Sequence, residues 1–313
     1  MKALVIGGSG FIGSYLIEKL ISNGLDVINF DLNASKIEKV KTIKGDIRIK
    51  SDLEKIESDF NRVYILAAVH RDDIQSYNKY YETNVNGLEN IIDFCDSKDI
   101  NEVIYYSSAA VYGDSFVNAK ESDKLYPSNH YGKSKLKAEL SLRKWANKII
   151  DRKLLIIRPS VVYGLGSNSN MNRLIDYVRN NKFFIIGKGE NIKSISYVQN
   201  LVDFTCYISE EMGSQITIFN YSDYPQKSIK EVCEEISYIT KARKVMKVPY
   251  IFAYIFGCFL DFISFIINKK ISISLGRIKK SKTNTSLSVA KVQEAQYCPK
   301  IKFSDSISKT IQY

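Results

Sequence analysis

Short apolar runs alternate with segments of helical periodicity through the first half of the chain. Five of these runs have the length of strands and lie at residues 2–6, 26–30, 62–68, 102–106 and 154–159. Helical segments separate them at residues 14–21 and 84–92 and from Tyr131 onward. Strands that alternate with helices predict right-handed crossovers and a parallel, doubly wound α/β sheet of the Rossmann type. We therefore expect ligands at the carboxyl ends of the strands.

The strict alternation loosens after Gly164, where short strands are expected at residues 183–187 and 194–198. The chain of 313 residues is long enough for two regions with a sizeable core. We predict a first domain of the Rossmann type at residues 1–164. Residues 165–313 are predicted to form a smaller α/β substrate-binding region that is interleaved with the sheet.

The composition is that of a soluble globular protein, with 45% hydrophobic and 25% charged residues. The five cysteines are scattered and lack Cys-x-x-Cys spacing, so neither a disulfide framework nor a zinc site is expected. No carboxylate or cysteine has metal-ligand spacing around His70 or His130, and we predict no metal. The amino-terminal residues show no signal-peptide pattern, which together with reduced thiols predicts a cytoplasmic protein.

The net charge of +11 is unevenly distributed. Residues 1–240 carry 31 basic and 31 acidic side chains, whereas residues 241–282 carry ten basic side chains and one acidic side chain. This asymmetry indicates a polyanionic partner, either nucleic acid or an anionic membrane surface. We do not expect nucleic-acid binding, because no recognition motif is present and the nearby aromatics form one apolar run.

That apolar run spans residues 248–268, inside the basic segment 244–282, and contains five phenylalanines and only one charged residue, Asp261. It approaches transmembrane length, but Pro249, Gly257 and Asp261 interrupt it. Lysines on both sides favour a segment in the membrane interface, with aromatics buried and cations at anionic headgroups. A core helix of the substrate-binding region is the alternative interpretation.

A glycine-rich turn joins the first strand to the first helix. Gly7 permits the tight turn, Gly10 lets the backbone approach a diphosphate, and Gly13 allows close helix-to-strand packing. Asp31 ends the second strand, where a carboxylate suits the ribose hydroxyls of NAD and repels the 2′-phosphate of NADP. These residues predict NAD. Two small residues at the end of the third run either leave room for the dinucleotide or pack in the core: Ala67 and Ala68.

A phenol and an ammonium lie one helical turn apart at Tyr131 and Lys135. A buried ammonium beside a phenol favours phenolate, the form that a general base needs. Hydroxyls of Ser107 and Ser108 follow the fourth strand, at the edge where the sheet presents its ligands. Beside a dinucleotide, these groups can remove an alcohol proton while hydride leaves the same carbon.

In these motifs the chain resembles the extended short-chain dehydrogenase/reductases, the NAD-dependent sugar epimerases and dehydratases. The matching pieces are GGSGFIG (7–13), Asp31, GDI (45–47), LAA (66–68), NVNG (84–87), YSSAAVYG (106–113), YGKSK (131–135) and RPSVVYG (158–164). The resemblance implies that Tyr131 is the catalytic base or acid, that Lys135 bonds the nicotinamide ribose and that Ser108 binds the reacting hydroxyl. It implies adenine contacts for Asp46 and Ile47. The remaining NAD contacts that it implies are Phe11, Ile12, Leu66, Asn84 and Pro159.

A narrower similarity is to bacterial 4-epimerases that act on N-acetylglucosaminyl-diphospho-undecaprenol. It rests on LAAVHRDD (66–73), SNHYGKSK (128–135), KSISYVQN (193–200) and the pattern FGCFLDF, INKK and RIKK near the carboxyl terminus. Many UDP-sugar epimerases have acidic residues, as in Val-Asp-Asp, where this chain has Val198-Gln199-Asn200. The similarity implies interconversion of GlcNAc and GalNAc on the lipid through a 4-keto sugar, for surface-polysaccharide synthesis. It also implies a location at the inner face of the cell membrane.

The resemblance implies substrate contacts at His70, Arg71 and Ser108. His130 lines the substrate pocket or packs, and Lys193 binds the diphosphate or is a solvated surface residue. Three other functions remain open: a UDP-sugar 4-epimerase, a reductase or dehydratase of a nucleotide 4-keto sugar, and a catalytically silent NAD-binding regulatory protein. A homodimer is a further partner that the resemblance allows.

Overall fold

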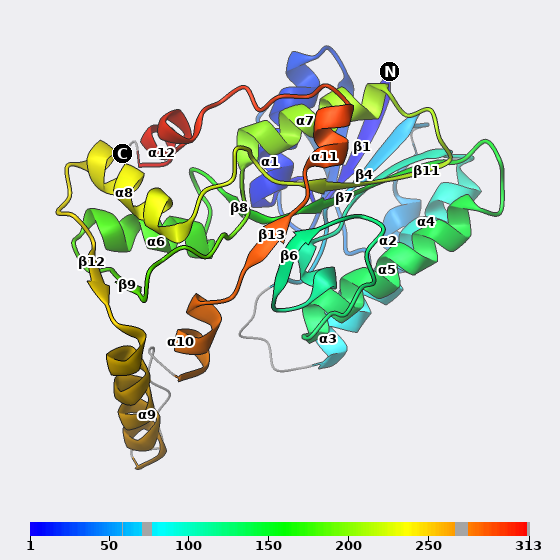
Figure 1. Ribbon diagram of the computed structural model, residues 1–313. Helices are drawn as coiled ribbons and strands as arrows, with labels where there is room; N and C mark the ends of the chain where they lie inside the picture. The colour runs from blue at the N-terminus through cyan, green and yellow to red at the C-terminus, as the bar shows by residue number, and fades with distance from the viewer. Residues whose placement is uncertain (58, 71–76, 267–274, 312–313) are drawn as a thin grey trace.

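The computed structural model describes residues 1–57, 59–70, 77–266 and 275–311. Within these residues the centre of the fold is a parallel sheet of seven strands in the order β11-β7-β5-β4-β1-β2-β3 (Figure 1). This confirms the predicted Rossmann-type sheet. The strands are β1 (Lys2–Ile6), β2 (Asp26–Asp31), β3 (Lys41–Lys44), β4 (Arg62–Ile65), β5 (Glu102–Tyr106), β7 (Lys153–Pro159) and β11 (Ile216–Tyr221).

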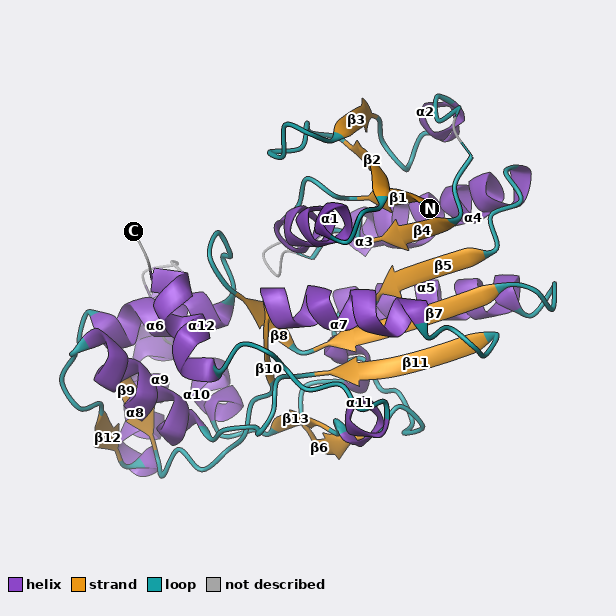
Figure 2. Cartoon of the chain, turned by 90° about the horizontal axis from the view of Figure 1, so that it is seen from above, coloured by secondary structure: helices purple, strands orange, loops and turns teal. Residues whose placement is uncertain are grey.

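Helices cover both faces of the sheet, which is why its central strands are apolar on both sides (Figure 2). One face packs against α1 (Phe11–Ser22), α7 (Val198–Glu210) and α11 (Ala290–Glu294). The other face packs against α2 (Lys50–Glu54), α4 (Gly87–Ser97) and α5 (His130–Ala146). Because all seven strands are parallel, their carboxyl ends share one edge, and the loops at that edge can form a common site.

Short elements connect the sheet to its surroundings at that edge. The helix α3 (Tyr77–Tyr81) continues into the π-helical turn η1 (Glu82–Asn86), and the 3₁₀ turn η2 (Ala109–Tyr112) follows β5. Three two-strand ladders complete the described strands. They are β6 (Phe116–Ala119) with β13 (Thr285–Leu287), β8 (Val161–Tyr163) with β10 (Ile195–Tyr197), and β9 (Phe184–Ile186) with β12 (Met246–Val248).

A separate apolar cluster lies beyond the sheet. Its helices are α6 (Asn170–Arg179), α8 (Ile229–Thr240) and α12 (Phe303–Ile311). In contrast, α7, β11 and α11 return to the sheet layers, so the chain after Gly164 contributes to both parts. The domain boundary at residue 164 remains a prediction.

The predicted strands correspond to observed strands with small shifts at their ends, and two strands of the large sheet, β3 and β11, were not predicted. Two of the shifts have a clear cause. The strand expected at residues 62–68 ends at Ile65, because the amides of Leu66 and Ala67 both donate to the carbonyl of Ile6, at 2.8 and 2.9 Å, which interrupts the regular ladder. The strand expected at 194–198 ends at Tyr197, since Val198 begins α7.

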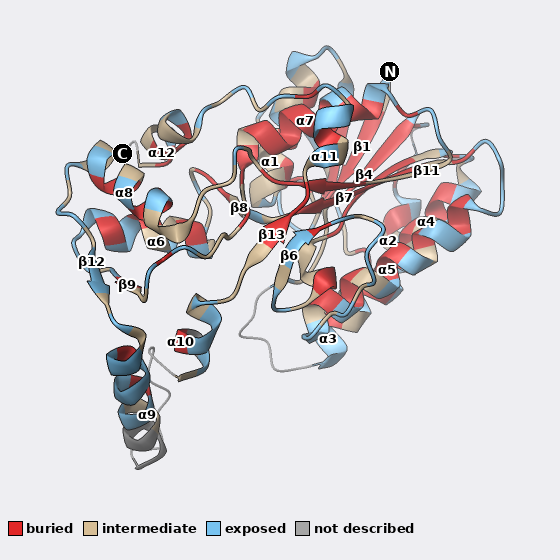
Figure 3. Cartoon of the chain, viewed as in Figure 1, coloured by how far each residue is buried: buried red, intermediate tan, exposed pale blue. Residues whose placement is uncertain are grey.

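The apolar run after Pro249 is helical, and most of its described large side chains are exposed. It forms α9 (Tyr250–Ile266), followed beyond the gap by α10 (Leu275–Ser281). Figure 3 shows α9 as a largely exposed helix that extends away from the sheet. Six large side chains on it are 38–69% exposed: Ile251, Phe252, Tyr254, Ile255, Phe256 and Phe259. Among the described residues, no helix has both the length and the apolar character needed to span a membrane.

Candidate active site

The glycine turn lies directly against the end of β4. Gly7 has a φ of +90°, and a Cβ atom there would lie 2.4 Å from the amide nitrogen of Ala67. A Cβ on Gly13 would lie 2.4 Å from the carbonyl oxygen of Gly7. At these two glycines the backbone is therefore packed too closely for a side chain, which leaves peptide groups exposed at the amino terminus of α1. Such a surface suits a diphosphate.

Asp31 lies beside this turn at the end of β2. One carboxylate oxygen accepts a 3.0 Å hydrogen bond from the amide of Ser9, and the other accepts one from the amide of Asn33. Asn29 was not predicted as part of the site, yet its Oδ1 accepts a 3.0 Å bond from the amide of Gly8 in the same turn. The sequence signal was an amide residue within an apolar strand, and in the structure Asn29 is fully buried. A glycine-rich cradle with a carboxylate beside it fits a dinucleotide with a 2′-hydroxyl.

The other predicted NAD contacts lie around the same edge. Phe11 and Ile12 open α1, and Pro159 ends β7. Leu66, Ala67 and Ala68 follow β4 and are partly exposed. Together with the glycine turn, these residues border the ends of β1, β4 and β7, as a dinucleotide-binding edge requires.

Three predicted contacts have partners within the protein. The guanidinium of Arg48 bonds Asp46 and lowers the pKa of that carboxyl. Ile47 is buried against Gly87, where a Cβ would lie 2.8 Å from its Cγ1. The amide group of Asn84 bonds both backbone groups of Val69, at 2.8 and 2.9 Å, and fixes the segment after β4.

Tyr131 lies on the first turn of α5, because Asn129 caps this helix through a 2.8 Å bond from the amide of Gly132. A Cβ on Gly132 would lie 2.5 Å from the carbonyl oxygen of Ala110 in η2. Ser108 caps η2, since its Oγ accepts a 3.1 Å bond from the amide of Ala110. The turn that carries Ser108 thus touches the turn that carries Tyr131, and the structure brings these two residues to one place.

Lys135 is 2% exposed and lies one turn further along α5. Its Nζ donates a 2.6 Å hydrogen bond to the carbonyl of Tyr106 and lies 4.6 Å from the centre of the Tyr105 ring. Burial lowers the pKa of Lys135 to about 7, and the charge of Glu139 opposes this effect. An ammonium that changes charge near neutral pH can tune a neighbouring phenol in the same range.

A buried ion pair beneath these residues was not predicted. Glu139 and Arg158 are each 1% exposed and lie 2.7 Å apart. The sequence carried a signal for both: Glu139 continues the four-residue spacing of Tyr131 and Lys135, and Arg158 is a charged residue within an apolar strand.

The predicted substrate contacts are more scattered. His70 and His130 are exposed, and the His130 ring lies edge-on to Tyr77, with centroids 5.2 Å apart. The Nζ of Lys193 donates to the carbonyl of Thr283 at 2.9 Å, and burial lowers the pKa of Lys193. Lys193 is thus a partly buried residue beside β13 and not a solvated surface lysine. Arg71 lies outside the described residues.

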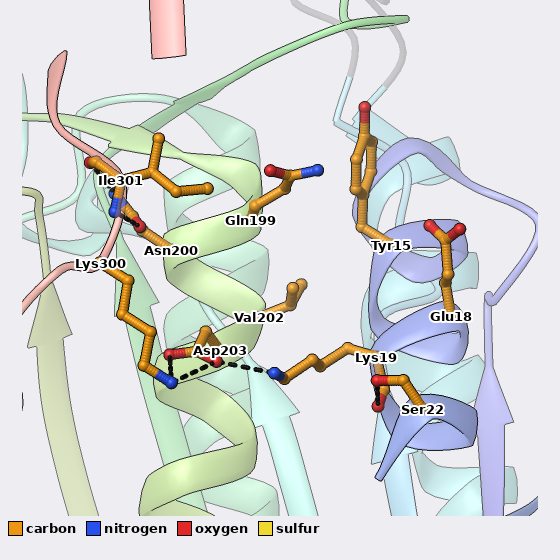
Figure 4. Close-up of a pocket in the computed structure, with 10 residues that line it drawn as sticks. All are labelled: Tyr15, Glu18, Lys19, Ser22, Gln199, Asn200, Val202, Asp203, Lys300 and Ile301. Atoms are coloured by element: carbon orange, nitrogen blue, oxygen red, sulfur yellow. Dashed lines mark hydrogen bonds and ion pairs between the residues drawn. The ribbon is translucent and has the colours of Figure 1, made fainter. Parts of the chain in front are cut away.

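Within the described ranges, no group of three or more His, Cys, Asp or Glu residues could hold a metal ion. Figure 4 shows a hollow between α1 and α7, where Lys19 and Lys300 both reach the carboxylate of Asp203, at 2.9 Å each. None of the predicted site residues lines it, and its buried carboxylate is already neutralised by the two lysines.

Residues 3–220 match the model of the "NAD dependent epimerase/dehydratase family". The chain belongs to this family. NAD is therefore its cofactor, which the glycine turn and Asp31 fit, and the family places the protein among NAD-dependent enzymes. The roles of individual residues follow from geometry and remain proposals.

Individual relatives agree with this membership. The chain is 34% identical to an N-acetyl-α-D-glucosaminyl-diphospho-ditrans,octacis-undecaprenol 4-epimerase of Escherichia coli O157:H7, across all of this chain and 95% of the relative. It is 27% identical to a UDP-glucose 4-epimerase of Lactobacillus helveticus, across 77% of this chain and 82% of the relative.

Solved structures share the fold. A UDP-glucose 4-epimerase from Thermotoga maritima, solved with UDP-glucose, superposes with a TM-score of 0.78 at 21% identity, over all of this chain and 98% of that one. A UDP-glucuronic acid 4-epimerase from Bacillus cereus, in complex with NAD, also gives 0.78 at 21% identity, over 99% and 97%.

Proposed function

We propose that this protein is an NAD-dependent 4-epimerase that interconverts N-acetylglucosamine and N-acetylgalactosamine on undecaprenyl diphosphate, for surface-polysaccharide synthesis. The observation that carries the reaction type is the contact between the Ser108 and Tyr131 turns, at the same edge of the sheet as the glycine turn. The full-length similarity to the Escherichia coli epimerase supports the substrate.

In the proposed mechanism, Tyr131 takes the proton of the C4 hydroxyl. Lys135 favours the phenolate by its positive charge, and Ser108 hydrogen-bonds the reacting oxygen. Bound NAD supplies the capacity to oxidise C4 and to reduce it again, so no net redox change results. The 4-keto sugar then turns so that the opposite face of C4 is reduced, and Tyr131 returns the proton to the oxygen. We propose that His70, His130 and Lys193 contact the substrate.

A lipid-linked substrate would explain why α9 has an exposed apolar face. Its exposed residues Ile251, Phe252, Ile255, Phe256 and Phe259 follow a spacing that places them on one helix face. Ala253 and Gly257 are buried, and Gly257 packs against Ile278 of α10. The exposed face therefore has the pattern of a helix that lies in a membrane surface.

Exposed lysines precede α9 at Lys244 and Lys247 and lie on the packed helix α10 at Lys279 and Lys280, of which Lys280 also pairs with Asp114 at 3.4 Å. Each lysine near an anionic surface contributes about 1 kcal/mol to binding. We propose that α9 and these lysines hold the protein at the inner face of the cell membrane. The polyprenyl chain then stays in the bilayer while the sugar reaches Tyr131.

A UDP-sugar 4-epimerase is the second candidate, favoured by the fold shared with UDP-sugar epimerases. To separate the two, the purified protein is incubated with UDP-N-acetylglucosamine and, in a parallel sample, with N-acetylglucosaminyl-diphospho-undecaprenol. The released sugars are then analysed. Epimerisation of the lipid-linked sugar is expected, and conversion of the UDP-sugar alone would defeat the lipid-substrate proposal. Stoichiometric NADH consumption would indicate a reductase, loss of water a dehydratase, and no turnover of either donor a regulatory protein.

A further inference from the structure

The carboxylate of Glu139 is saturated with hydrogen bonds at the centre of the catalytic region. Arg158 donates to both of its oxygens, from Nε at 3.0 Å and from Nη2 at 2.7 Å. The hydroxyl of Ser107 donates to the oxygen that accepts from Nε. Paired geometry of this kind fixes orientation as well as charge.

These bonds join the elements that carry the catalytic groups. Ser107 directly precedes Ser108, and its amide donates a 2.8 Å bond to Ile157 of β7. Arg158 also donates a 2.8 Å bond to the hydroxyl of Tyr112, at the far end of η2. Both ends of the Ser108-capped turn are therefore attached, through Arg158 and Ser107, to one residue of α5.

The same carboxylate lies one helical turn beyond Lys135, on the face that also carries Tyr131. Burying a charged pair seldom adds stability over a well-packed apolar pair of similar size, so stability alone gives little reason for charges here. The contact of Glu139 with Ser107, and its position one turn from Lys135, give a functional reason for a buried charge at this place.

We infer that Glu139 is a positioning residue for the proposed reaction: through Ser107 it fixes Ser108 against α5, and by its charge it holds Lys135 as the ammonium. This inference rests on the proposed function for its effect on turnover. Its effect on Lys135 can be measured without any substrate.

The groups around this pair determine the expected direction. Tyr105 and Glu139 act on Lys135, and Tyr131 acts on Tyr105. Ser107 and Arg158 bond Glu139, Tyr112 and Glu121 bond Arg158, and Lys291 is a further cation near Arg158. Replacing Glu139 with glutamine removes the buried negative charge and leaves the Arg158 cation uncompensated. Both changes disfavour the ammonium form of Lys135, so this lysine should lose its proton at lower pH.

The direct test is an NMR titration of protein labelled at lysine Cε. One lysine signal should titrate near neutral pH in the parent protein and should be missing from Lys135→Arg. In Glu139→Gln its midpoint should fall by about 1 pH unit. An unchanged midpoint would overturn the electrostatic part of the inference, whatever the substrate proves to be.

Ser107→Ala separates positioning from charge, because it retains the carboxylate. It should leave the Lys135 midpoint in place and lower kcat by about tenfold, with little change in KM. Glu139→Gln should lower kcat and also move the alkaline limb of the pH profile to lower pH. If Ser107→Ala keeps the full kcat, Glu139 does not position Ser108.

Glu102→Gln is the matched control. Glu102 pairs with the buried Arg62 at 2.8 Å, at the opposite end of β5 from Ser107. The Glu102→Gln variant should have a lower thermal unfolding midpoint but the same Lys135 titration midpoint and the same pH profile of kcat as the parent. If Glu102→Gln shifts the Lys135 midpoint as much as Glu139→Gln does, then the loss of any ion pair produces the shift, and the inference fails. If Glu139→Gln does not fold, Glu139→Asp replaces it, and partial retention of the midpoint is then expected.

Discussion

The ammonium of Lys135 donates a 2.6 Å hydrogen bond to the backbone carbonyl of Tyr106, the last residue of β5. This bond joins the helix that carries Tyr131 to the strand end that leads into Ser108. The side chain expected to tune the phenol therefore also fixes the distance between the two catalytic turns. Removing it should change stability as well as activity.

Lys135→Met should alter how stability depends on pH. Burial lowers the pKa of Lys135 from 10.5 to about 7, so between these values the unfolded chain binds more protons than the folded protein. The free energy of unfolding of the parent protein should therefore rise with pH over this range, by on the order of 4 kcal/mol. Methionine cannot titrate, so the variant should lose this slope.

Urea unfolding of both proteins between pH 6 and 10 measures the effect. The free energy of unfolding of the parent should fall furthest below that of Lys135→Met at pH values under 7, where the buried Lys135 side chain is charged. Parallel pH profiles for the two proteins would show that Lys135 is not the depressed group.

Tyr131→Phe should remove the proton acceptor and leave the dinucleotide site intact. Turnover of the lipid-linked sugar should fall by at least about 10²-fold, since the phenyl ring cannot take the C4 proton. NAD affinity, measured by isothermal titration calorimetry, should stay within about threefold of the parent, well below a tenfold change in binding. Tyr126→Phe, at a ring that is 62% exposed, is the control and should keep full turnover. Retained epimerisation in Tyr131→Phe would refute the assigned role.

Gly7→Ala should abolish NAD binding, because its Cβ would collide with the amide nitrogen of Ala67 at 2.4 Å. Gly24→Ala is a matched control: Gly24 has a similar φ of +83°, yet nothing lies within 4 Å of its added Cβ. Gly24→Ala should lose about 1–2 kcal/mol of stability from the left-handed backbone, and Gly7→Ala should lose more because of its collision. Only Gly7→Ala should also lose NAD affinity in calorimetry. Equal affinities in the two variants would contradict the assignment of the glycine turn as the diphosphate-binding site.

The exposed face of α9 should bind anionic vesicles. The triple substitution Phe252→Ser, Phe256→Ser and Phe259→Ser should reduce flotation with such vesicles by at least tenfold, because each buried phenylalanine contributes about 1.5–3 kcal/mol. The folded core should be unaffected, since all three rings are at least 50% exposed.

The control for that experiment changes three exposed apolar residues elsewhere: Val117→Ser, Ile150→Ser and Tyr238→Ser. These residues are 71–85% exposed, so the loss of apolar surface is comparable. Equal flotation of both triple variants would show that α9 has no special affinity for the bilayer.

The sequence by itself determined five of the seven strands of the sheet and the cofactor, and it predicted the helix that carries Tyr131. The spacing of Gly7, Gly10 and Gly13 between a strand and a helix, and Asp31 at the next strand end, are local patterns. The spacing of Tyr131 and Lys135 is also local, since a helix places residues four apart on one face. The resemblance to the epimerase/dehydratase family was visible in the same short motifs and was confirmed by the match over residues 3–220.

Only the tertiary structure decided which of these residues meet and what lies behind them. Glu139 and Arg158 belong to a helix and a strand, and periodicity does not say which buried charges will pair across that boundary. The apolar run after Pro249 was compatible with a core helix until the fold left Phe252, Phe256 and Phe259 exposed. Periodicity and composition describe what one segment can bury, whereas burial itself depends on which other segments the chain brings against it.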